Sequence, residues 1–253
     1  MIKVILNGCC GKMGNAIVES VSKCSDIEIV SGIDKHKNDY YKFPIYDSIE
    51  KCKEDADVII DFSRPDSIAD LLNFAKRRNI PIIICTTGFS KEQEELIHSF
   101  SKSIPVFKSS NMSIGINLLS GILKKVSGIL YNDFDIEIIE AHHNQKVDSP
   151  SGTALMLYNS IKDSVKEDLP ISYGRKGISK RKKDEIGMHS IRGGTIAGTH
   201  EVLFAGRDEI IEFKHEALSR NIFAVGALKA VRFVADKKPG FYTMDDVISE
   251  LIK

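Results

Sequence analysis

The chain has 253 residues, of which 42% are hydrophobic and 28% charged, as is ordinary for a globular protein with one large domain or two modest ones. Lysine plus arginine and aspartate plus glutamate both number 35, and the net charge of zero argues against a general nucleic-acid binder, although not against local basic patches. The longest apolar runs, such as residues 80–85, fall far short of the roughly 20 residues that span a membrane, so no membrane partner is expected.

The N-terminal residues and the pattern of cysteines favour a reducing cellular compartment. Residues 1–3 lead directly into a strand-like stretch, without the pattern of a signal or transit segment. The cysteines are odd in number and include no C-x-x-C pair, which predicts neither a disulfide framework nor a zinc site. They are Cys9, Cys10, Cys24, Cys52 and Cys85. We therefore expect a reduced, cytoplasmic chain without a metal.

Residues 1–111 alternate between strand and helix patterns. Short apolar stretches predict strands, and apolar residues at helical spacing predict helices between them. The expected strands are 2–7, 27–33, 58–62, 80–86 and 104–107, and the expected helices begin near 12, 68 and 91. Such alternation predicts an α/β domain with a doubly wound parallel sheet of the Rossmann type.

The pattern changes after residue 112. A helix is expected over 114–130, and alternation around Ile136 and Ile138 predicts a strand with one solvated face. A helix follows 150–153, and then come three strand-like stretches at 186–196, 200–205 and 209–216. These predict a second, α+β domain on a mixed or antiparallel sheet over 112–219. The helices expected over 221–235 and after Thr243 are assigned to the first domain, which 220–253 would complete.

The loop Gly8-Cys9-Cys10-Gly11-Lys12-Met13-Gly14 is a G-x-x-G-x-x-G variant of the dinucleotide-binding pattern. It follows a strand and opens a helix, where backbone N–H groups can approach a pyrophosphate. Asp34 lies 20 residues beyond Gly14, where a carboxylate accepts hydrogen bonds from a ribose. A tight turn with a solvated aspartate is the alternative, and we favour dinucleotide binding.

Three further segments near this loop either contribute to the ligand site or are ordinary loops and turns. Cations at 35–37, Lys35 among them, would offset the charge of a 2′-phosphate or form a solvated loop. The segments Thr86-Thr87-Gly88 and Ser109-Ser110-Asn111-Met112 end two expected strands, where ligands of open parallel sheets bind. Ordinary turn chemistry would explain each of them singly.

Residues 140–153 contain the highest concentration of side chains suited to catalysis or anion binding. His142 and His143 end a strand, Lys146 follows, and Gly152 and Thr153 open a helix that offers free N–H groups. Such a cluster suits carboxylates and can supply a proton. The alternatives are a metal-binding histidine pair, structural histidines and a simple helix cap.

Two other features favour plain interpretations. The basic run 175–183 is expected to be a solvated loop, although its cations would also attract an anion. Gly193 and Gly194, within the expected strand 186–196, indicate a bulge or a close backbone approach.

The chain resembles the 4-hydroxy-tetrahydrodipicolinate reductase (dihydrodipicolinate reductase) family over nearly its whole length. Residues 140–153 are similar to the family signature E-x-H-H-x-x-K-x-D-x-P-S-G-T, which is the most specific part of the resemblance. The glycine loop, Asp61-Phe62-Ser63-Arg64-Pro65, Thr86-Thr87-Gly88-Phe89 and Asn111-Met112-Ser113-Ile114-Gly115 also fit. So do segments 186–194, 200–202 and 215–223. Cys9-Cys10 departs from the small residues usual in the loop, and Gly174-Arg175-Lys176-Gly177 stands where a glutamate often follows the arginine.

The resemblance implies NADH or NADPH as hydride donor, a cyclic imine dicarboxylate as substrate and a homotetramer. It implies that His142 is the catalytic acid/base, that Lys146 donates a proton and also contacts the substrate, and that His143, Gly152 and Thr153 hold a substrate carboxylate. The implied cofactor contacts are Gly8, Cys9, Cys10, Gly11, Lys12, Met13, Asp34, Lys35, Cys85, Thr86, Thr87, Ser109, Ser110, Asn111, Met112, Arg220 and Phe223.

Two other functions remain as alternatives. One is an aspartate or homoserine type dehydrogenase of similar architecture, against which the spacing from Lys146 to Thr153 argues. The other is a dinucleotide-sensing binding protein without turnover, which would need the glycine loop but neither His142 nor Lys146.

Overall fold

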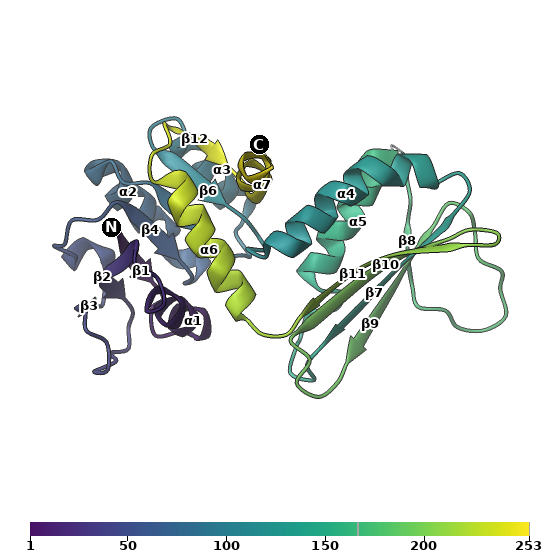
Figure 1. Cartoon of the computed structure of the whole chain (residues 1–253), viewed down its shortest axis with the longest axis horizontal. Coiled ribbons are helices and arrows are strands. Elements are labelled where there is room, and N and C mark those ends of the chain that lie inside the picture. The colour runs from purple at the N-terminus through teal and green to yellow at the C-terminus, as the bar shows by residue number, and fades with distance from the viewer. Residues whose placement is uncertain (166, 253) are drawn as a thin grey trace. The chain divides into compact units, whose positions relative to one another are not determined.

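A computed structural model describes residues 1–165 and 167–252 of the chain (Figure 1). The chain forms two compact units. One consists of Met1–Ile114 with Arg220–Lys253, and the other of Gly115–Ser219. Each unit has its own sheet and its own hydrophobic core.

The first unit is built on a seven-stranded parallel sheet in the order β12-β6-β5-β4-β1-β2-β3. Its strands are β1 (Ile2–Asn7), β2 (Ile27–Ile33), β3 (Ile45–Tyr46), β4 (Val58–Asp61), β5 (Ile82–Ile84), β6 (Pro105–Lys108) and β12 (Gly240–Tyr242). Its helices are α1 (Lys12–Val21), α2 (Ile68–Arg78), α3 (Lys91–Phe100), α6 (Asn221–Val234) and α7 (Met244–Leu251). The predicted doubly wound parallel sheet is confirmed.

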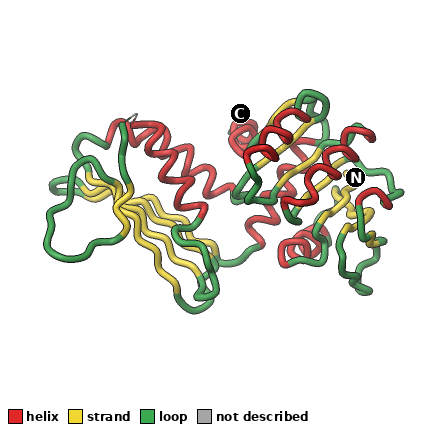
Figure 2. Tube along the Cα trace, turned by 180° about the vertical axis from the view of Figure 1, so that it is seen from behind, coloured by secondary structure: helices red, strands yellow, loops and turns green. Residues whose placement is uncertain are grey.

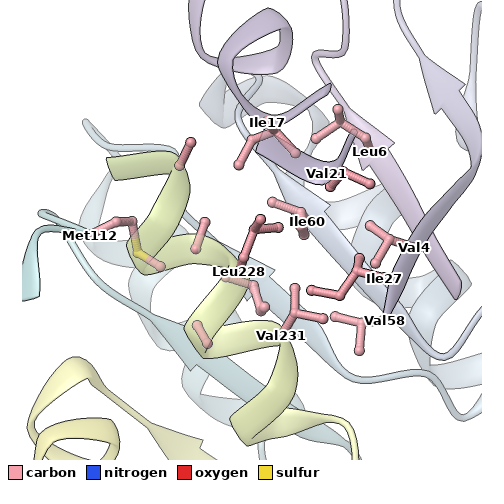
Figure 3. Packing of buried hydrophobic residues seen from close by; sticks show 14 of the residues in the cluster. Val4, Leu6, Ile17, Val21, Ile27, Val58, Ile60, Met112, Leu228 and Val231 are labelled. Carbon is pink, nitrogen blue, oxygen red and sulfur yellow. The ribbon is translucent and has the colours of Figure 1, made fainter. Parts of the chain in front are cut away.

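Both faces of this sheet are buried, which explains why its strands are almost continuously apolar. Helices α1, α6 and α7 pack on one face, where Ile17, Ile60 and Leu228 meet in a cluster (Figure 3). Helices α2 and α3 pack on the other face, around Leu72 and Ile97. The C-terminal helices thus complete the core of the first unit, and β12 adds a parallel strand beside β6.

Two helix starts follow from their sequences. Ser90 and Gln93 form the predicted capping box at α3, with the Ser90 hydroxyl accepting from the Gln93 N–H at 3.3 Å. Thr243 and Asp246 form a second capping box at α7. Each box satisfies donors that the first turn of a helix leaves unpaired.

The second unit has a five-stranded mixed sheet in the order β11-β10-β7-β9-β8. Strand β7 pairs antiparallel with β10 and parallel with β9, as the mixed-sheet prediction allowed. Its elements are α4 (Ile114–Leu130), β7 (Asp135–His142), α5 (Gly152–Val165), β8 (Ile171–Tyr173), β9 (Ile186–Arg192), β10 (Gly198–Ala205) and β11 (Ile210–Ala217). Both helices cover one face of the sheet (Figure 2). Leu123, Ile138 and Leu157 are buried together there.

Some elements differ from the sequence prediction. The strand expected over 186–196 ends at Arg192, because Gly194 adopts a φ of +49° in a turn instead of forming a bulge. The two- and three-residue strands β3, β8 and β12 were not predicted. None of the described helices combines the length and the apolar character that a membrane span requires.

Candidate active site

The glycine loop joins β1 to α1 at the carboxyl end of β1. Gly8 has a φ of +80°, and a Cβ there would lie 2.5 Å from the Phe62 carbonyl oxygen. A Cβ on Gly14 would overlap the carbonyl groups of Gly8 and Cys9, so α1 can begin this close to β1 only with glycine. A Cβ on Gly11 would lie 3.3 Å from the Gly8 oxygen. Packing within the chain therefore requires glycine at position 11 less strictly than at positions 8 and 14. Without a side chain at Gly11, a ligand can approach the backbone closely.

The start of α1 offers backbone donors. Within the described chain no side chain caps this helix, and its N-cap, Gly11, is extended. The first N–H groups of a helix have no partner in the helix, and together with the dipole they favour an anion. At the end of β2, the Asp34 carboxylate accepts from Cys10 N at 2.9 Å and from His36 N at 3.0 Å. Loop, helix start and carboxylate fit the pyrophosphate and ribose of a dinucleotide.

The other residues expected at the cofactor lie at the same edge of the sheet. They are Cys85, Thr86 and Thr87 after β5, Ser109, Ser110, Asn111 and Met112 after β6, and Arg220 and Phe223 at the start of α6. The side chain of Met112 belongs to the core, so only its backbone atoms remain for a dinucleotide, and the Cys9 thiol is buried against the same core. Lys35 is exposed beside Asp34.

A buried carboxyl group stands between these strand ends. Asp61, at the end of β4, is fully buried and accepts from the Asn7 amide at 2.8 Å and from the Ser63 N–H at 3.1 Å. Burial raises the pKa of Asp61 despite the donors around it. The carboxyl group ties the end of β1 to the turn that follows β4, the same turn against which Gly8 packs.

In the second unit, β7 carries the centre of the acid–base cluster. Residues of this strand alternate between half-buried and buried, and the buried face continues from Ile138 to Glu140 and His142. The Glu140 carboxylate lies 2.6 Å from His142 Nδ1. Because adjacent strand residues face opposite sides, Glu140 and His142 share the face that packs on the helices.

Arg192, at the end of the neighbouring strand β9, donates to both Glu140 oxygens from its two terminal guanidinium nitrogens, at 2.7 and 2.8 Å. The Ser151 N–H also donates to Glu140, at 3.2 Å. Burial opposes ionisation of Glu140, but the hydrogen bonds from Arg192, His142 and Ser190 outweigh it and lower its pKa to about 2. Glu140 is therefore an anion at neutral pH.

The Glu140 anion determines which ring nitrogen of His142 carries the proton. Burial lowers the pKa of His142, against the opposing effect of Glu140, so the ring is neutral at neutral pH. Its Nδ1 then carries the proton that is donated to Glu140, and Nε2 keeps a lone pair. A Cβ on Gly198 would lie 3.1 Å from Nε2, so glycine at this position leaves room beside the ring.

A second buried histidine supports the first. His200 of β10 packs edge-on against His142, with ring centroids 5.1 Å apart, and its Nε2 lies 3.0 Å from the Ser151 hydroxyl. Burial lowers the pKa of His200 to about 3, and repulsion from His142, when that ring is also protonated, adds to the effect. Ser151 also accepts from the Ala154 N–H at 3.2 Å, so it links the start of α5 to the histidines.

The remaining predicted residues surround this core. Lys146 Nζ lies 2.8 Å from the Asp148 carboxylate, and only about a fifth (21%) of its side chain is exposed. His143 and Thr153 are half-buried, and Gly152 is the first residue of α5. A Cβ on Gly152 would meet no atom within 4 Å. The second unit thus brings together an ammonium group, two imidazoles and a helix start.

The basic run 175–183 is partly structural. Arg175 bridges Glu137 and Glu185 at 2.8 and 2.9 Å, and Arg181 binds Asp135 and Glu137 at 3.0 and 3.1 Å. These two arginines are engaged with carboxylates of β7 and its surroundings, whereas the expectation was a solvated loop.

Sequence reasoning did not assign roles to Glu140, Arg192 and His200, and it saw Ser151 only as part of a helix start. The signal for Glu140 was present, because the inward alternation of Ile136 and Ile138 continues to it. No local signal marks Arg192 or His200, since their contacts depend on how β9 and β10 pair with β7.

Comparisons with known proteins cover both units. Family models described as "Dihydrodipicolinate reductase, N-terminus" and "Dihydrodipicolinate reductase, C-terminus" match residues 2–112 and 115–248. Proteins named 4-hydroxy-tetrahydrodipicolinate reductase from Clostridium novyi (strain NT) and Clostridium tetani (strain Massachusetts / E88) are 59% identical over 248 residues and 53% identical over 249. Each alignment covers 98% of both chains.

Solved structures share the fold. A dipicolinate-bound dihydrodipicolinate reductase from Paenisporosarcina sp. TG-14 has a TM-score of 0.79 and 24% identity, over 96% of this chain and 97% of that one. An aspartate dehydrogenase from Thermotoga maritima has a TM-score of 0.53 and 13% identity, over 94% of this chain and 98% of that one. Because both types of enzyme share the fold, the fold does not choose between them.

Proposed function

The chain belongs to the dihydrodipicolinate reductase family, and we propose that it reduces a cyclic imine dicarboxylate with NADH or NADPH. The substrate is 4-hydroxy-tetrahydrodipicolinate, or the dihydrodipicolinate formed from it by loss of water, and the product is tetrahydrodipicolinate. The reaction belongs to the diaminopimelate route of lysine biosynthesis in the cytoplasm. The observation that carries the proposal is the position of His142, whose Nδ1 is held by the Glu140 carboxylate that Arg192 binds, in the unit that also contains Lys146.

The two units divide the work in this proposal. Residues 1–111 with 220–253 bind the dinucleotide, whose nicotinamide supplies the hydride. The start of α1 binds the pyrophosphate, Asp34 accepts from the ribose, and the loops after β5 and β6 flank the nicotinamide. Lys35 offsets a 2′-phosphate, so both cofactors are used.

Residues 112–219 bind the substrate. Lys146, His143 and the N–H groups of Gly152 and Thr153 hold the carboxylates, which fixes the ring for hydride transfer. Reduction adds one hydride and one proton. Lys146 donates the proton to the substrate. His142 takes up a proton from solvent at Nε2 once a bound dianion raises its proton affinity, and this proton restores the Lys146 ammonium.

We also propose that the chain forms a homotetramer through the second unit. Among the described helices of this unit, α4 and α5 cover one face of the five-stranded sheet and none covers the other. That face carries the network of Glu137, Arg175, Arg181 and His189 together with apolar residues such as Leu203. Light scattering on the purified chain tests this, and a monomer at micromolar concentration would contradict it.

The test of the activity is NADH and NADPH oxidation with enzymatically generated dihydrodipicolinate, compared with oxaloacetate plus ammonia. We expect turnover only with the first substrate, and with both cofactors within about one to two decades in kcat/KM. Turnover of oxaloacetate would favour an aspartate type dehydrogenase. Tight NADH binding without turnover of either substrate would favour a sensing protein.

A further inference from the structure

Cys9, Cys10 and Asp34 form a cluster of two thiols and a carboxylate, which we call the thiol–carboxylate cluster. The two Sγ atoms are 3.8 Å apart, and both thiol sulfurs and a carboxylate oxygen lie within 4.8 Å of one another. In residues 1–165 and 167–252, no other group of at least three histidine, cysteine or acidic residues has ligand atoms so close together. The sequence did not predict the cluster, because its carboxylate comes from another strand end.

The distance between the sulfurs suits a tetrahedral metal ion. Zinc–sulfur bonds of about 2.3 Å at a tetrahedral angle place two sulfurs about 3.8 Å apart. A zinc–oxygen bond of about 2.0–2.2 Å places the carboxylate oxygen about 3.5 Å from each sulfur. Asp34 therefore has to approach by about 1.3 Å at most, which its side chain can do by rotation.

The surroundings bring the three groups close to one another. The turn after β1 directs two adjacent cysteines toward Asp34, whereas an extended strand would point them to opposite faces. Cys9 is fully buried beside Gly32, while Cys10 is partly exposed and gives solvent access to the cluster. The Cys10 and His36 N–H groups orient the carboxylate.

We propose that the thiol–carboxylate cluster binds a thiophilic divalent cation such as Zn²⁺ or Cd²⁺. Cys9 and Cys10 ligate as thiolates and Asp34 as a carboxylate, and water takes the fourth position. Both cysteines bind as thiolates, so binding releases their two protons to solvent. Two thiolates and a carboxylate are soft and charged enough to select Zn²⁺ or Cd²⁺ over Mg²⁺ or Ca²⁺.

The cation also regulates the enzyme, a consequence that rests on the proposed dinucleotide site. A cation held by Asp34 occupies the carboxylate that would otherwise accept from the ribose. It also stiffens the loop that has to fit the pyrophosphate. Cation and dinucleotide therefore exclude one another, and micromolar Zn²⁺ inhibits turnover competitively with NADH.

The test is titration of the whole chain with Cd²⁺ alone, followed by the ultraviolet charge-transfer absorption of cadmium–thiolate bonds. We expect one Cd²⁺ per chain with two thiolate bonds. Cys10→Ser should lower the Cd²⁺ affinity at least tenfold and halve the absorption, and Asp34→Asn should lower the affinity with the absorption retained. Cys24→Ser is the matched control, a partly buried cysteine of the same unit, and should change neither. An unchanged titration in Cys10→Ser, or a lost signal in Cys24→Ser, overturns the proposal.

Competition with NADH separates the two proposals. NADH at saturating concentration should lower the Cd²⁺ affinity at least tenfold. Cd²⁺ binding that NADH leaves unchanged overturns the regulatory consequence and leaves the cation site standing. NADH binding by a chain that takes up no Cd²⁺ overturns the cation site and leaves the dinucleotide site standing.

Discussion

The two units of the chain position their functional groups in different ways. The first unit presents mainly backbone: bare glycines, the N–H groups at the start of α1 and the loops after parallel strands. The second unit presents side chains that a buried ionic network holds, with Glu140 bound to His142 and Arg192. A site made of backbone groups depends little on the identity of its side chains, and it is disturbed mainly where a side chain is added at a glycine. A network of buried charges tolerates few, because each partner removed leaves another charge unpaired.

The largest expected effect is on catalysis in the second unit, from Lys146→Ala. Loss of a positioned proton donor typically costs about 10²–10⁴-fold in rate, so kcat should fall by that range and KM for the dicarboxylate should rise. NADH affinity should change little, since Lys146 belongs to the other unit. Steady-state kinetics and NADH fluorescence measure both. Lys162→Ala is the control, because Lys162 also pairs with an aspartate, at 3.1 Å on the surface of α5. Wild-type turnover in the Lys146 variant would remove this residue from the mechanism.

Glu140→Gln tests whether the network positions His142 or only stabilises the unit. The change leaves the Arg192 guanidinium without its counter-ion, which should lower the free energy of unfolding by about 3–5 kcal/mol. Asp135→Asn on the same strand removes a half-exposed partner of Arg181 and should cost about 0–1 kcal/mol. Urea unfolding measures both values.

A double variant separates the two roles. Glu140→Gln combined with Arg192→Met removes the unpaired charge and should recover most of the stability. Because the anion that orients His142 remains absent, kcat should stay low. Recovery of kcat together with stability would show that Glu140 has a purely structural role.

Gly11→Val tests the backbone character of the first unit. A Cβ at Gly11 meets only the Gly8 oxygen at 3.3 Å, so the variant should fold, and its side chain should obstruct the pyrophosphate. NADH affinity should fall at least tenfold, or about 1.4 kcal/mol, with little change in the midpoint of unfolding. Gly121→Val on α4, where a Cβ meets no atom within 4 Å, is the control. If NADH binds the folded Gly11 variant as tightly as wild type, the glycine loop does not bind the pyrophosphate.

Acid should weaken the second unit through His200. Its pKa of about 3 in the folded chain lies below the value of 6.5 expected after unfolding, so the unfolded state binds more protons between these values. Its contribution is complete above pH 6.5 and is lost as the pH falls toward 3, at a slope of about 1.4 kcal/mol per pH unit. Glu140 adds a further loss of folding free energy as the pH falls from 4.5 to about 2, because its pKa is about 2 in the folded chain.

His200→Gln should remove the part of the pH dependence of the unfolding free energy that His200 contributes. The free energy of unfolding, measured in urea at pH 7, 6 and 5, should fall less steeply in the variant than in wild type. The surface variant His98→Gln on α3 should keep the wild-type slope. Equal slopes in wild type and the His200 variant would mean that His200 also binds a proton when folded.

The same contrast explains what the sequence could predict. The glycine loop, Asp34 and the capping box at Ser90 are signals within a few residues or one strand–helix unit, and the predicted helices and long strands follow from apolar periodicity. The network around Glu140 depends on the register of β7 with β9, which pairs His142 with Arg192 at a separation of 50 residues. The thiol–carboxylate cluster likewise joins two strand ends, and β3 and β12 are too short to show a period.

The smallest expected effect is on the choice of cofactor. Asp34 is expected to favour NADH, because a carboxylate accepts from the 2′-hydroxyl and repels a 2′-phosphate. Lys35 is exposed beside it, and an exposed charge is worth only about 0–1 kcal/mol, so its removal should shift the ratio of kcat/KM for NADH and NADPH less than about tenfold, toward NADH. The shift should shrink at high ionic strength, since salt screens exposed charges. The measurement is that ratio in wild type and Lys35→Ala at two ionic strengths, with Lys23→Ala, an exposed lysine near the far end of α1, as the control. An unchanged ratio in Lys35→Ala would show that Lys35 is only a solvated loop residue.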